Sequence, residues 1–388
     1  MIIKYISSAM EKNDFEKLFL NSQQIPGQQA QKFNRLMIEG FAENDQTVFA
    51  ISGRPVTSLT CKSKWLSSAK TKQNERVIYI YNSVVNIPII KNILQTAGTF
   101  FRVLMEGGNN EQVVVMDVLN ASVAYGAMLA AKIKRIPCIG IVTDLPQLLV
   151  TGTGGKHVKM VDKVIEGCSG YVFLTEAMDE VLNPRKKPYV VVEGLCDTVI
   201  EEKCESPNKE IRIVLYAGLL DSRYGVKNMV DSFLAANIPG AELHVYGDGS
   251  YVEELKNLSK QHRNVVYHGV VMNDEIVEAE RKADLLVNPR PTHEEFTKYS
   301  FPSKNMEYMA SGTPVLTTNL PGMPREYQDY VFLFHGDDVE TMTSDFISVL
   351  NKPKEELKKV GKDARNFVLH KKNKKVQTGR ILELLEIK

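Results

Sequence analysis

The stretch "SFPSKNMEYMASGTPVL", residues 300–316, places a hydroxyl, an ammonium and a carboxylate just ahead of an apolar run. Pro302 suits the first turn of a helix, where its missing N–H costs nothing. Ser303 and Lys304 would then lie at a helix N-terminus, which favours anions. Glu307, one turn further, would repel phosphate but can accept hydrogen bonds from a ribose diol. Phosphate followed by ribose indicates a nucleotide, and a capped helix with an incidental ion pair is the alternative.

Short apolar runs in the first half of the chain alternate with amphipathic stretches of helical spacing. Strands are predicted at residues 2–6, 47–51, 77–81, 112–116, 138–142 and 170–174. Between the first two of these, apolar residues at 33, 36, 37 and 41 follow Gly27 at helical spacing. Alternating β and α elements predict an α/β fold with a parallel, doubly wound sheet.

A second series of the same kind begins after a polar, Pro-containing stretch at 196–212, which reads as a linker. Further strands are predicted at residues 214–217, 242–246, 265–267, 284–287, 313–316 and 330–333. We therefore expect two Rossmann-like domains, at 1–198 and 199–370, with a helix at 371–388 closing the fold. A ligand is expected in the cleft between two such halves, near the carboxyl ends of the strands.

The composition excludes several classes of protein. The 388 residues suit two domains, and 43% hydrophobic with 24% charged residues is ordinary for a globular protein. A net charge of +1 gives no pull toward nucleic acid. Five scattered cysteines without CxxC spacing predict buried thiols in a cytoplasmic protein rather than a disulfide frame or a zinc site. The sequence has no apolar run of membrane-spanning length.

The segment from Asn351 onward is basic, with twelve Lys or Arg against five acids. Ile381, Leu384 and Leu385 form an apolar stripe within it. One interpretation is a solvated helix face that closes the fold. The other is a peripheral contact with an anionic membrane surface.

Several segments, in this order, resemble those of GT-B glycosyltransferases of the retaining group-one family, including enzymes of capsule and exopolysaccharide synthesis. They are "PGQQAQKFNRLMIEGF", "GIVTDLP", "FLTEAMDEVL", "VVVEGLCD", "LYAGLLDSRYGVKNMVDSFL", "LHVYGDGSY", "VVYHGVV" and "FPSKNMEYMASGTPVL". The resemblance covers nearly the whole chain, and the segments of the second half are specific only in combination.

The resemblance implies a donor site in the second domain and an acceptor site in the first. Nucleotide and diphosphate would be bound by Gly218, Arg223, Lys227, Gly247, Val271, Ser303, Lys304 and Glu307. The donor sugar would lie near Tyr299, Ser300, Phe301 and Pro302, and the acceptor near Gly27 and Gln28. It also implies that no metal or other cofactor is required.

The sequence departs from the family pattern in the donor site. Glu307 matches the ribose-binding second carboxylate of a two-glutamate motif, but the first falls on Tyr299. Glu294, Glu295 or backbone N–H groups at 300–302 are candidates to replace it.

A second departure concerns the diphosphate. The usual Arg and Lys positions carry Leu219 and Tyr224. The leaving diphosphate still needs positive charge, and we expect Lys304 to supply it, assisted by Arg223 or Lys227.

Asp144 follows the apolar run "CIGIV" and should lie at the carboxyl end of a central strand. It could orient an acceptor or donor-sugar hydroxyl, act as a base if the enzyme inverts, or cap the following turn. Two other segments receive weaker predictions. Arg54 is expected at the surface, with contact to an acceptor phosphate as the alternative. The segment "TGTGGKH" at 151–157 is expected to be a mobile loop near the acceptor, with a second nucleotide site as the alternative.

These observations predict a hexosyltransferase that moves a sugar from a UDP-linked donor to a saccharide or lipid-linked saccharide. The expected setting is cell-surface polysaccharide synthesis at the cytoplasmic face of the membrane. Two alternatives share the fold: a non-catalytic partner subunit of a glycosyltransferase, and a nucleotide-sugar epimerase. An NAD-dependent enzyme is disfavoured because no GxGxxG follows the first strand.

Overall fold

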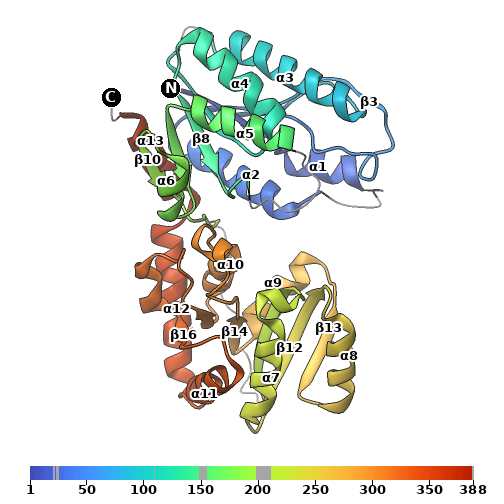
Figure 1. The fold of residues 1–388 in the computed structure, drawn as a ribbon, viewed down its shortest axis with the longest axis vertical. Coiled ribbons are helices and arrows are strands. Elements are labelled where there is room, and N and C mark those ends of the chain that lie inside the picture. The colour runs from blue at the N-terminus through green and yellow to red at the C-terminus, as the bar shows by residue number, and fades with distance from the viewer. Residues whose placement is uncertain (21, 23–25, 109, 148–154, 198–210, 387–388) are drawn as a thin grey trace. The chain divides into compact units, whose positions relative to one another are not determined.

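The computed structural model divides the chain into two compact units, whose elements are labelled in Figure 1. Unit 1 comprises Met1–Leu195 together with Lys374–Lys388, and unit 2 comprises Cys196–Asn373. The structure describes all residues except 21, 23–25, 109, 148–154, 198–210 and 387–388. Most of the expected linker, Cys204 and most of the expected loop at 151–157 therefore lie outside the described residues.

The sheet of unit 1 has the strand order β10-β9-β8-β7-β1-β2-β5-β4, and only β4 runs antiparallel to its neighbour. The strands are β1 Ile2–Ser7, β2 Thr47–Ser52, β4 Ala69–Lys72, β5 Val77–Tyr81, β7 Gln112–Asp117, β8 Cys138–Val142, β9 Gly170–Phe173 and β10 Tyr189–Val191. A separate pair joins β3 Trp65–Leu66 to β6 Val84–Val85. Every strand expected in this half is present, whereas β3, β4, β6 and β10 were not predicted.

The helices of unit 1 come mostly between its strands along the chain. They are α1 Lys12–Phe19, α2 Gln28–Glu43, α3 Pro88–Met105, α4 Ala121–Lys134, α5 Gly155–Gly167, α6 Ala177–Leu182 and α13 Lys374–Glu386. Ile381 and Leu384 of α13 are buried in the same core as Phe41 of α2 and Tyr5 of β1. The last helix of the chain is therefore part of unit 1.

Two lysines of the basic C-terminal segment are buried and form ion pairs. The Lys372 ammonium lies 2.5 Å from the Glu326 carboxylate within unit 2. The Lys374 ammonium lies 2.8 Å from the Glu39 carboxylate within unit 1. These two charges hold the fold together and are not part of a solvated face. None of the helices in the described part of the chain is both long enough and apolar enough to cross a membrane.

Unit 2 contains a parallel six-stranded sheet of order β13-β12-β11-β14-β15-β16. Its strands are β11 Arg212–Leu219, β12 Ala241–Asp248, β13 Val265–Gly269, β14 Leu285–Asn288, β15 Val315–Thr318 and β16 Phe332–Phe334. Its helices are α7 Val226–Ala236, α8 Val252–Gln261, α9 Asn273–Lys282, α10 Ser303–Ser311, α11 Val339–Leu350 and α12 Lys354–Lys371, with single 3₁₀ turns η1 Ser222–Tyr224, η2 Glu295–Lys298 and η3 Arg325–Tyr330. The predicted α/β class with two parallel sheets is confirmed.

The strand expected at 313–316 begins two positions late, at Val315. Pro314 has no N–H to give to a neighbouring strand. Thr313 instead turns its hydroxyl to the Glu280 carbonyl, at 2.7 Å. Pro302 likewise occupies the N-cap position just before α10 rather than its first turn, and Gly312 ends the helix with a left-handed φ of 81°.

Tyr308 of α10 completes the hydrogen bonding of strand β11. β11 is paired with β14 only at Val214 and Leu215. Further along, the Tyr308 hydroxyl accepts a hydrogen bond from the Ala217 N–H at 3.0 Å and donates one to the Ala217 carbonyl at 3.3 Å. The side chain is fully buried, and burial raises the pKa of its hydroxyl well above the usual range. Tyr308 therefore satisfies backbone groups that water does not reach.

Replacing Tyr308→Phe should lower the free energy of unfolding by about 1–3 kcal/mol, because two buried backbone groups lose their partner. The measurement is urea unfolding followed by circular dichroism. Tyr330→Phe is the matched control, because that ring is only partly buried and keeps its stacking on Phe367 at a centroid distance of 4.3 Å. Equal effects of the two substitutions would contradict the role given to the Tyr308 hydroxyl.

Candidate active site

The carboxyl ends of β11 and β12 approach each other closely in unit 2. Gly247, at the end of β12, has a left-handed φ of 134°, and a Cβ there would overlap the Gly218 carbonyl oxygen of β11. A Cβ at Gly249 would likewise overlap the Leu220 carbonyl oxygen. Glycine is thus required at 247 on both counts. Because these glycines have no side chains, backbone atoms of Gly218, Gly247 and Gly249 form the surface at this edge of the sheet, which we call the backbone floor. Ligands bind at this edge in open parallel sheets.

Helix α10 is fixed beside this floor by side chains on its inner face. The Asn288 amide of β14 donates to the Asn305 amide oxygen at 2.7 Å, and the Asn305 amide donates to the Thr317 hydroxyl at 3.2 Å. Because Asn305 and Tyr308 are buried, the opposite side of the first turns of α10 faces outward. Ser303 is exposed, and Lys304 and Glu307 are partly buried.

The side chain of Lys304 lies over the end of β11. Its Cε is 3.2 Å from the place that a Cβ on Gly218 would occupy, so the glycine makes room for the lysine stem. Among the described residues, no carboxylate forms an ion pair with the Lys304 ammonium. The cation therefore stands at a helix N-terminus with its charge available to an anion.

The two other predicted cations, Arg223 and Lys227, are engaged with carboxylates. Arg223 pairs with Asp221 at 3.1 Å, and the hydrogen bond from Arg223 lowers the pKa of Asp221. Lys227 lies 2.5 Å from Glu254. Arg223 is exposed and Lys227 is partly buried, and their role toward a diphosphate stays a prediction.

Arg290 is a cation at this edge that the sequence reading missed. It follows β14, and its guanidinium lies over the rings of Tyr224 at 5.1 Å and Phe296 at 5.7 Å. Its Nη1 lies 3.5 Å from the Ser300 hydroxyl. The signal was present in the sequence, because Arg290 stands between two prolines directly after an apolar run.

The loop expected to hold the donor sugar runs from η2 to the start of α10. Tyr299 ends η2 and, like Ser300, is partly buried. Phe301 is buried, with its ring 4.9 Å from that of Tyr327, so its side chain serves the core and only its backbone is available to a ligand. Pro302 is also buried.

The carboxylates proposed to replace the missing glutamate lie at the start of this loop, and Val271 lies on another element. Glu294 is partly buried and Glu295 is exposed. Val271, after β13, is partly buried against a cluster of the core that contains Tyr308. The role of these residues toward the donor stays a prediction.

In unit 1, two aspartates stand at the carboxyl ends of neighbouring strands. Asp144, after β8, is exposed. Asp117, the last residue of β7, is buried, and burial raises its pKa to about 6, with a smaller contribution from the charge of Asp144. Asp117 accepts hydrogen bonds from the Leu119 N–H at 3.1 Å and the Asn120 amide at 2.5 Å. The sequence reading missed Asp117, although it ends an apolar run just as Asp144 does.

The predicted acceptor residues lie at the start of α2. Gly27 is the N-cap residue and Gln28 opens the helix, and both are exposed. A Cβ at Gly27 would meet no atom within 4 Å, so packing does not require glycine there. The inner face of the same helix is held by Gln31, whose amide oxygen accepts the Met10 N–H at 2.9 Å.

Arg54 corrects one expectation. It was predicted at the surface, but it is buried and its guanidinium donates to the carbonyls of Leu66, Ser67 and Asn82, the last at 2.8 Å. Burial lowers its pKa. Arg54 therefore ties the loop after β2 to its neighbours instead of contacting a ligand at the surface.

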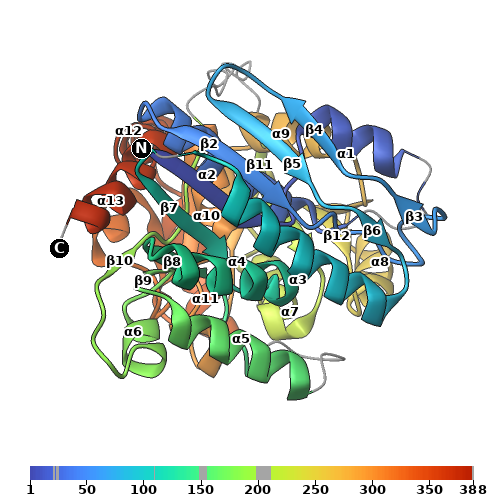
Figure 2. The ribbon, with the colours of Figure 1, turned by 90° about the horizontal axis from the view of Figure 1, so that it is seen from above.

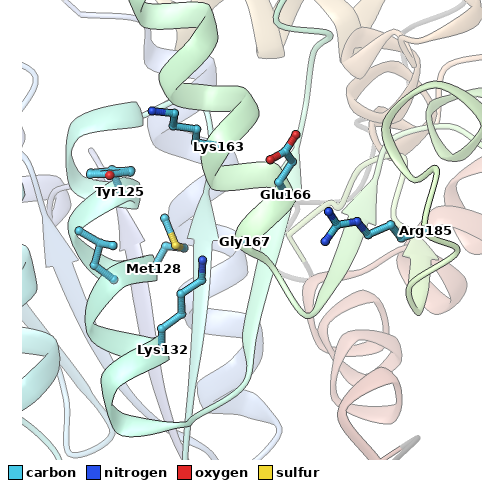
Figure 3. Close-up of a pocket in the computed structure, with 8 residues that line it drawn as sticks. Tyr125, Met128, Lys132, Lys163, Glu166, Gly167 and Arg185 are labelled. Atoms are coloured by element: carbon cyan, nitrogen blue, oxygen red, sulfur yellow. The ribbon is translucent and has the colours of Figure 1, made fainter.

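A pocket of 290 Å³ lies elsewhere in unit 1, on the outer side of α4 and α5 (Figure 3). Lys132 of α4 and Lys163 and Glu166 of α5 line it, together with Arg185 from the loop after α6. Because Lys132 is in the last turn of α4, the pocket is removed from the carboxyl edge where Asp117 and Asp144 lie. It is not part of the candidate site.

Comparison with known proteins finds a family match within unit 2. Residues 199–367 match the family model described as glycosyl transferases group 1. No curated protein matches the sequence.

Solved structures with the same fold include glycosyltransferases at low sequence identity. Sucrose-phosphate synthase from Thermosynechococcus elongatus is similar with a TM-score of 0.68 and 14% identity, over 100% of this chain and 98% of that chain. HepE of Anabaena, solved in complex with UDP, has a TM-score of 0.62 and 13% identity over 100% of both chains. TarM of S. aureus has a TM-score of 0.66 and 10% identity, over 99% of this chain and 98% of that chain. The matched domain and the shared fold identify the chain as a glycosyltransferase of the GT-B fold.

Proposed function

We propose that the protein transfers a sugar from a UDP-linked donor, bound by unit 2, to the hydroxyl of a saccharide or lipid-linked saccharide. The observation that carries the proposal is the Lys304 ammonium over Gly218, at the N-terminus of α10 and with no ion-pair partner among the described residues. HepE, which has the same fold, has been solved with UDP and with UDP-glucose. A nucleoside diphosphate fits an edge that offers a backbone floor, a cation and a carboxylate one helical turn away.

The proposed mechanism assigns the charge of the leaving diphosphate to the protein. Lys304 and the first N–H groups of α10 would stabilise the charge as the bond to the sugar breaks, with no metal required. Arg290 is the second cation of this edge, and its hydrogen bond to Ser300 directs it toward the segment proposed to hold the sugar. Glu307 would bind the ribose hydroxyls, because a carboxylate accepts two hydrogen bonds.

The acceptor side of the proposal involves unit 1. Asp144 would orient the attacking hydroxyl, since it is exposed at the carboxyl edge of the sheet and Asp117 lies next to it. Retention of the anomeric configuration, and a place in capsule or exopolysaccharide synthesis at the cytoplasmic face of the membrane, follow from the family resemblance.

The role of Lys304 can be tested without knowing the acceptor, by the slow hydrolysis of UDP-glucose. Lys304→Ala should lower kcat at least ~100-fold, because a preorganised charge acts most strongly on the transition state. Lys304→Arg should recover part of the rate, since the charge is kept and the geometry changes. Lys256→Ala, which removes an exposed lysine of α8 paired with Glu253, is the control. A near-normal kcat in Lys304→Ala would assign the diphosphate to other cations.

The role of Glu307 is tested by the affinity for UDP. Glu307→Ala should weaken binding by about 1.5–3 kcal/mol, or roughly 10–150-fold, because the ribose loses a charged acceptor. Isothermal titration calorimetry with UDP gives this number directly. Glu356→Ala removes a surface carboxylate of α12 and should leave the affinity unchanged. Wild-type affinity in a folded Glu307→Ala protein would be incompatible with the ribose contact.

Asp144 should affect turnover and not donor binding. Asp144→Asn keeps the shape and removes the charge, so the rate of transfer or donor hydrolysis should fall at least about tenfold. The affinity for UDP should stay near that of the wild type. Asp45→Asn is a suitable control, because Asp45 is exposed and its φ of 62° suits asparagine. A parallel loss of UDP affinity in Asp144→Asn would place this residue in the donor site.

A further inference from the structure

Helix α3 exposes an unusual number of large apolar side chains. Ile89 is 76% exposed, Ile93 63%, Phe101 56% and Met105 71%. Most surface helices of globular proteins turn their apolar stripe toward the core. In α3 the apolar stripe is turned outward.

The two halves of α3 show this inversion clearly. At about 100° per residue, one half of the helix circumference is entirely apolar, with Ile89, Ile90, Ile93, Leu94, Ala97, Phe100, Phe101, Leu104 and Met105. The opposite half carries Gln95 and Thr99, which are both buried, and Thr96, whose hydroxyl donates to the Ser122 carbonyl of α4 at 2.8 Å. The half with Gln95 and Thr99 thus faces the protein, where Val103 is also buried, and five side chains of the apolar half are exposed to solvent.

The exposed apolar surface continues beyond the start of α3. Trp65 in β3 lies opposite Val85 in β6, and the Asn86 N–H donates to the Lys64 carbonyl at 2.8 Å. Trp65 is 58% exposed, and Leu59 and Ile87 are each about half exposed. Figure 2 shows β3 and β6 at one end of α3. We call this surface, formed by the apolar half of α3 with Leu59, Trp65 and Ile87, the α3 face.

Positive charge accompanies the α3 face. Residues 47–105 contain eight Lys or Arg and a single acid, Glu75. Three of these cations are paired with acids just outside the range, Arg76 with Asp45 and both Lys70 and Arg102 with Glu106. Lys62 and Lys64 are exposed beside Trp65. Other basic residues of the segment serve the fold, since the Lys91 ammonium donates to the Val56 carbonyl at 3.1 Å. Lys62 and Lys64, next to Trp65, therefore offer positive charge to a binding partner.

We propose that the α3 face docks on an anionic phospholipid surface. An apolar helix face bearing isoleucine and phenylalanine inserts at the boundary of headgroups and acyl chains, an exposed Trp suits the same depth, and lysines bind the lipid phosphates. A second copy of this chain fits less well, because the α3 face contains no acidic residue that could lie opposite Lys62 and Lys64 of the other copy.

The α3 face lies at a place that suits a lipid-linked acceptor. β5 ends at Tyr81 and α3 begins at Pro88, so the start of α3 is at the carboxyl edge of the unit 1 sheet, the edge that also carries Asp144. Docking would hold that edge close to the membrane. The inference goes beyond the proposed transfer reaction, and its test uses neither donor nor acceptor.

The test is flotation of the full-length protein with phosphatidylcholine vesicles that contain or lack phosphatidylglycerol. The wild type should float with the anionic vesicles, and less so with neutral vesicles or at high salt. The double variant Ile89→Ser, Ile93→Ser should lower the bound fraction at least about tenfold, because it removes two exposed side chains from the apolar half. Lys62→Glu with Lys64→Glu should abolish the preference for anionic vesicles. Val181→Ser, at an exposed apolar residue of α6, is the matched control and should bind as the wild type does.

Two outcomes would overturn the proposal. One is a wild type that stays unbound with anionic vesicles at low salt. The other is binding that the Ile89→Ser, Ile93→Ser variant retains in full while its urea unfolding, followed by circular dichroism, shows that it is folded. Sedimentation equilibrium identifies the competing occupant, since a wild-type dimer that the same variant dissociates, with no vesicle binding, would assign the α3 face to a second copy.

Discussion

The hydrogen bonds between the Tyr308 hydroxyl and Ala217 are the constraint on which the candidate donor site depends. They fix the rotation of α10 about its own axis, because Tyr308 has to face β11. Lys304, one turn earlier, is thereby directed over Gly218. A helix held only by apolar packing could turn by several degrees at small cost, and the ammonium would then move relative to the end of β11. A buried polar contact costs too much to break for such a rotation.

The glycines at the carboxyl edge of the sheet also help to position the Lys304 ammonium. Gly218 leaves space for the lysine stem, and Gly247 allows β12 to approach the Gly218 carbonyl. A cation held over bare backbone keeps its position without a carboxylate partner. Arg223 and Lys227 differ from Lys304 because each is paired with an acid. Charge that is already paired contributes less to binding an anion, so position and pairing distinguish cations that the sequence alone treats as equal.

The parallel strands could be predicted because strands covered on both faces read as continuous apolar runs, as at 138–142 and 112–116. The helix start at Ser303–Glu307 could also be predicted from local sequence, because a proline, a hydroxyl and charged side chains lie within a few residues. Long-range pairing has no such local signal. Nothing near Arg54 in the sequence shows that its guanidinium reaches the Asn82 carbonyl, and nothing near Lys227 identifies Glu254 as its partner. Asp117 and Arg290 did have a local signal, as polar residues at the ends of apolar runs.

Helix α3 shows a limit of reading hydrophobic periodicity. Its pattern predicts an amphipathic helix correctly, and the usual rule would bury the apolar half. The rule assumes that water is the only alternative to the protein core. In α3 the half that meets the protein carries Gln95, Thr96 and Thr99, and the Thr96 hydroxyl has its partner on α4. Side chains that pack against a neighbouring helix while satisfying hydrogen bonds can hold a helix in place without burying its apolar half. That half then suits a surface less polar than water, and the exposed Lys62 and Lys64 favour a surface that carries negative charge.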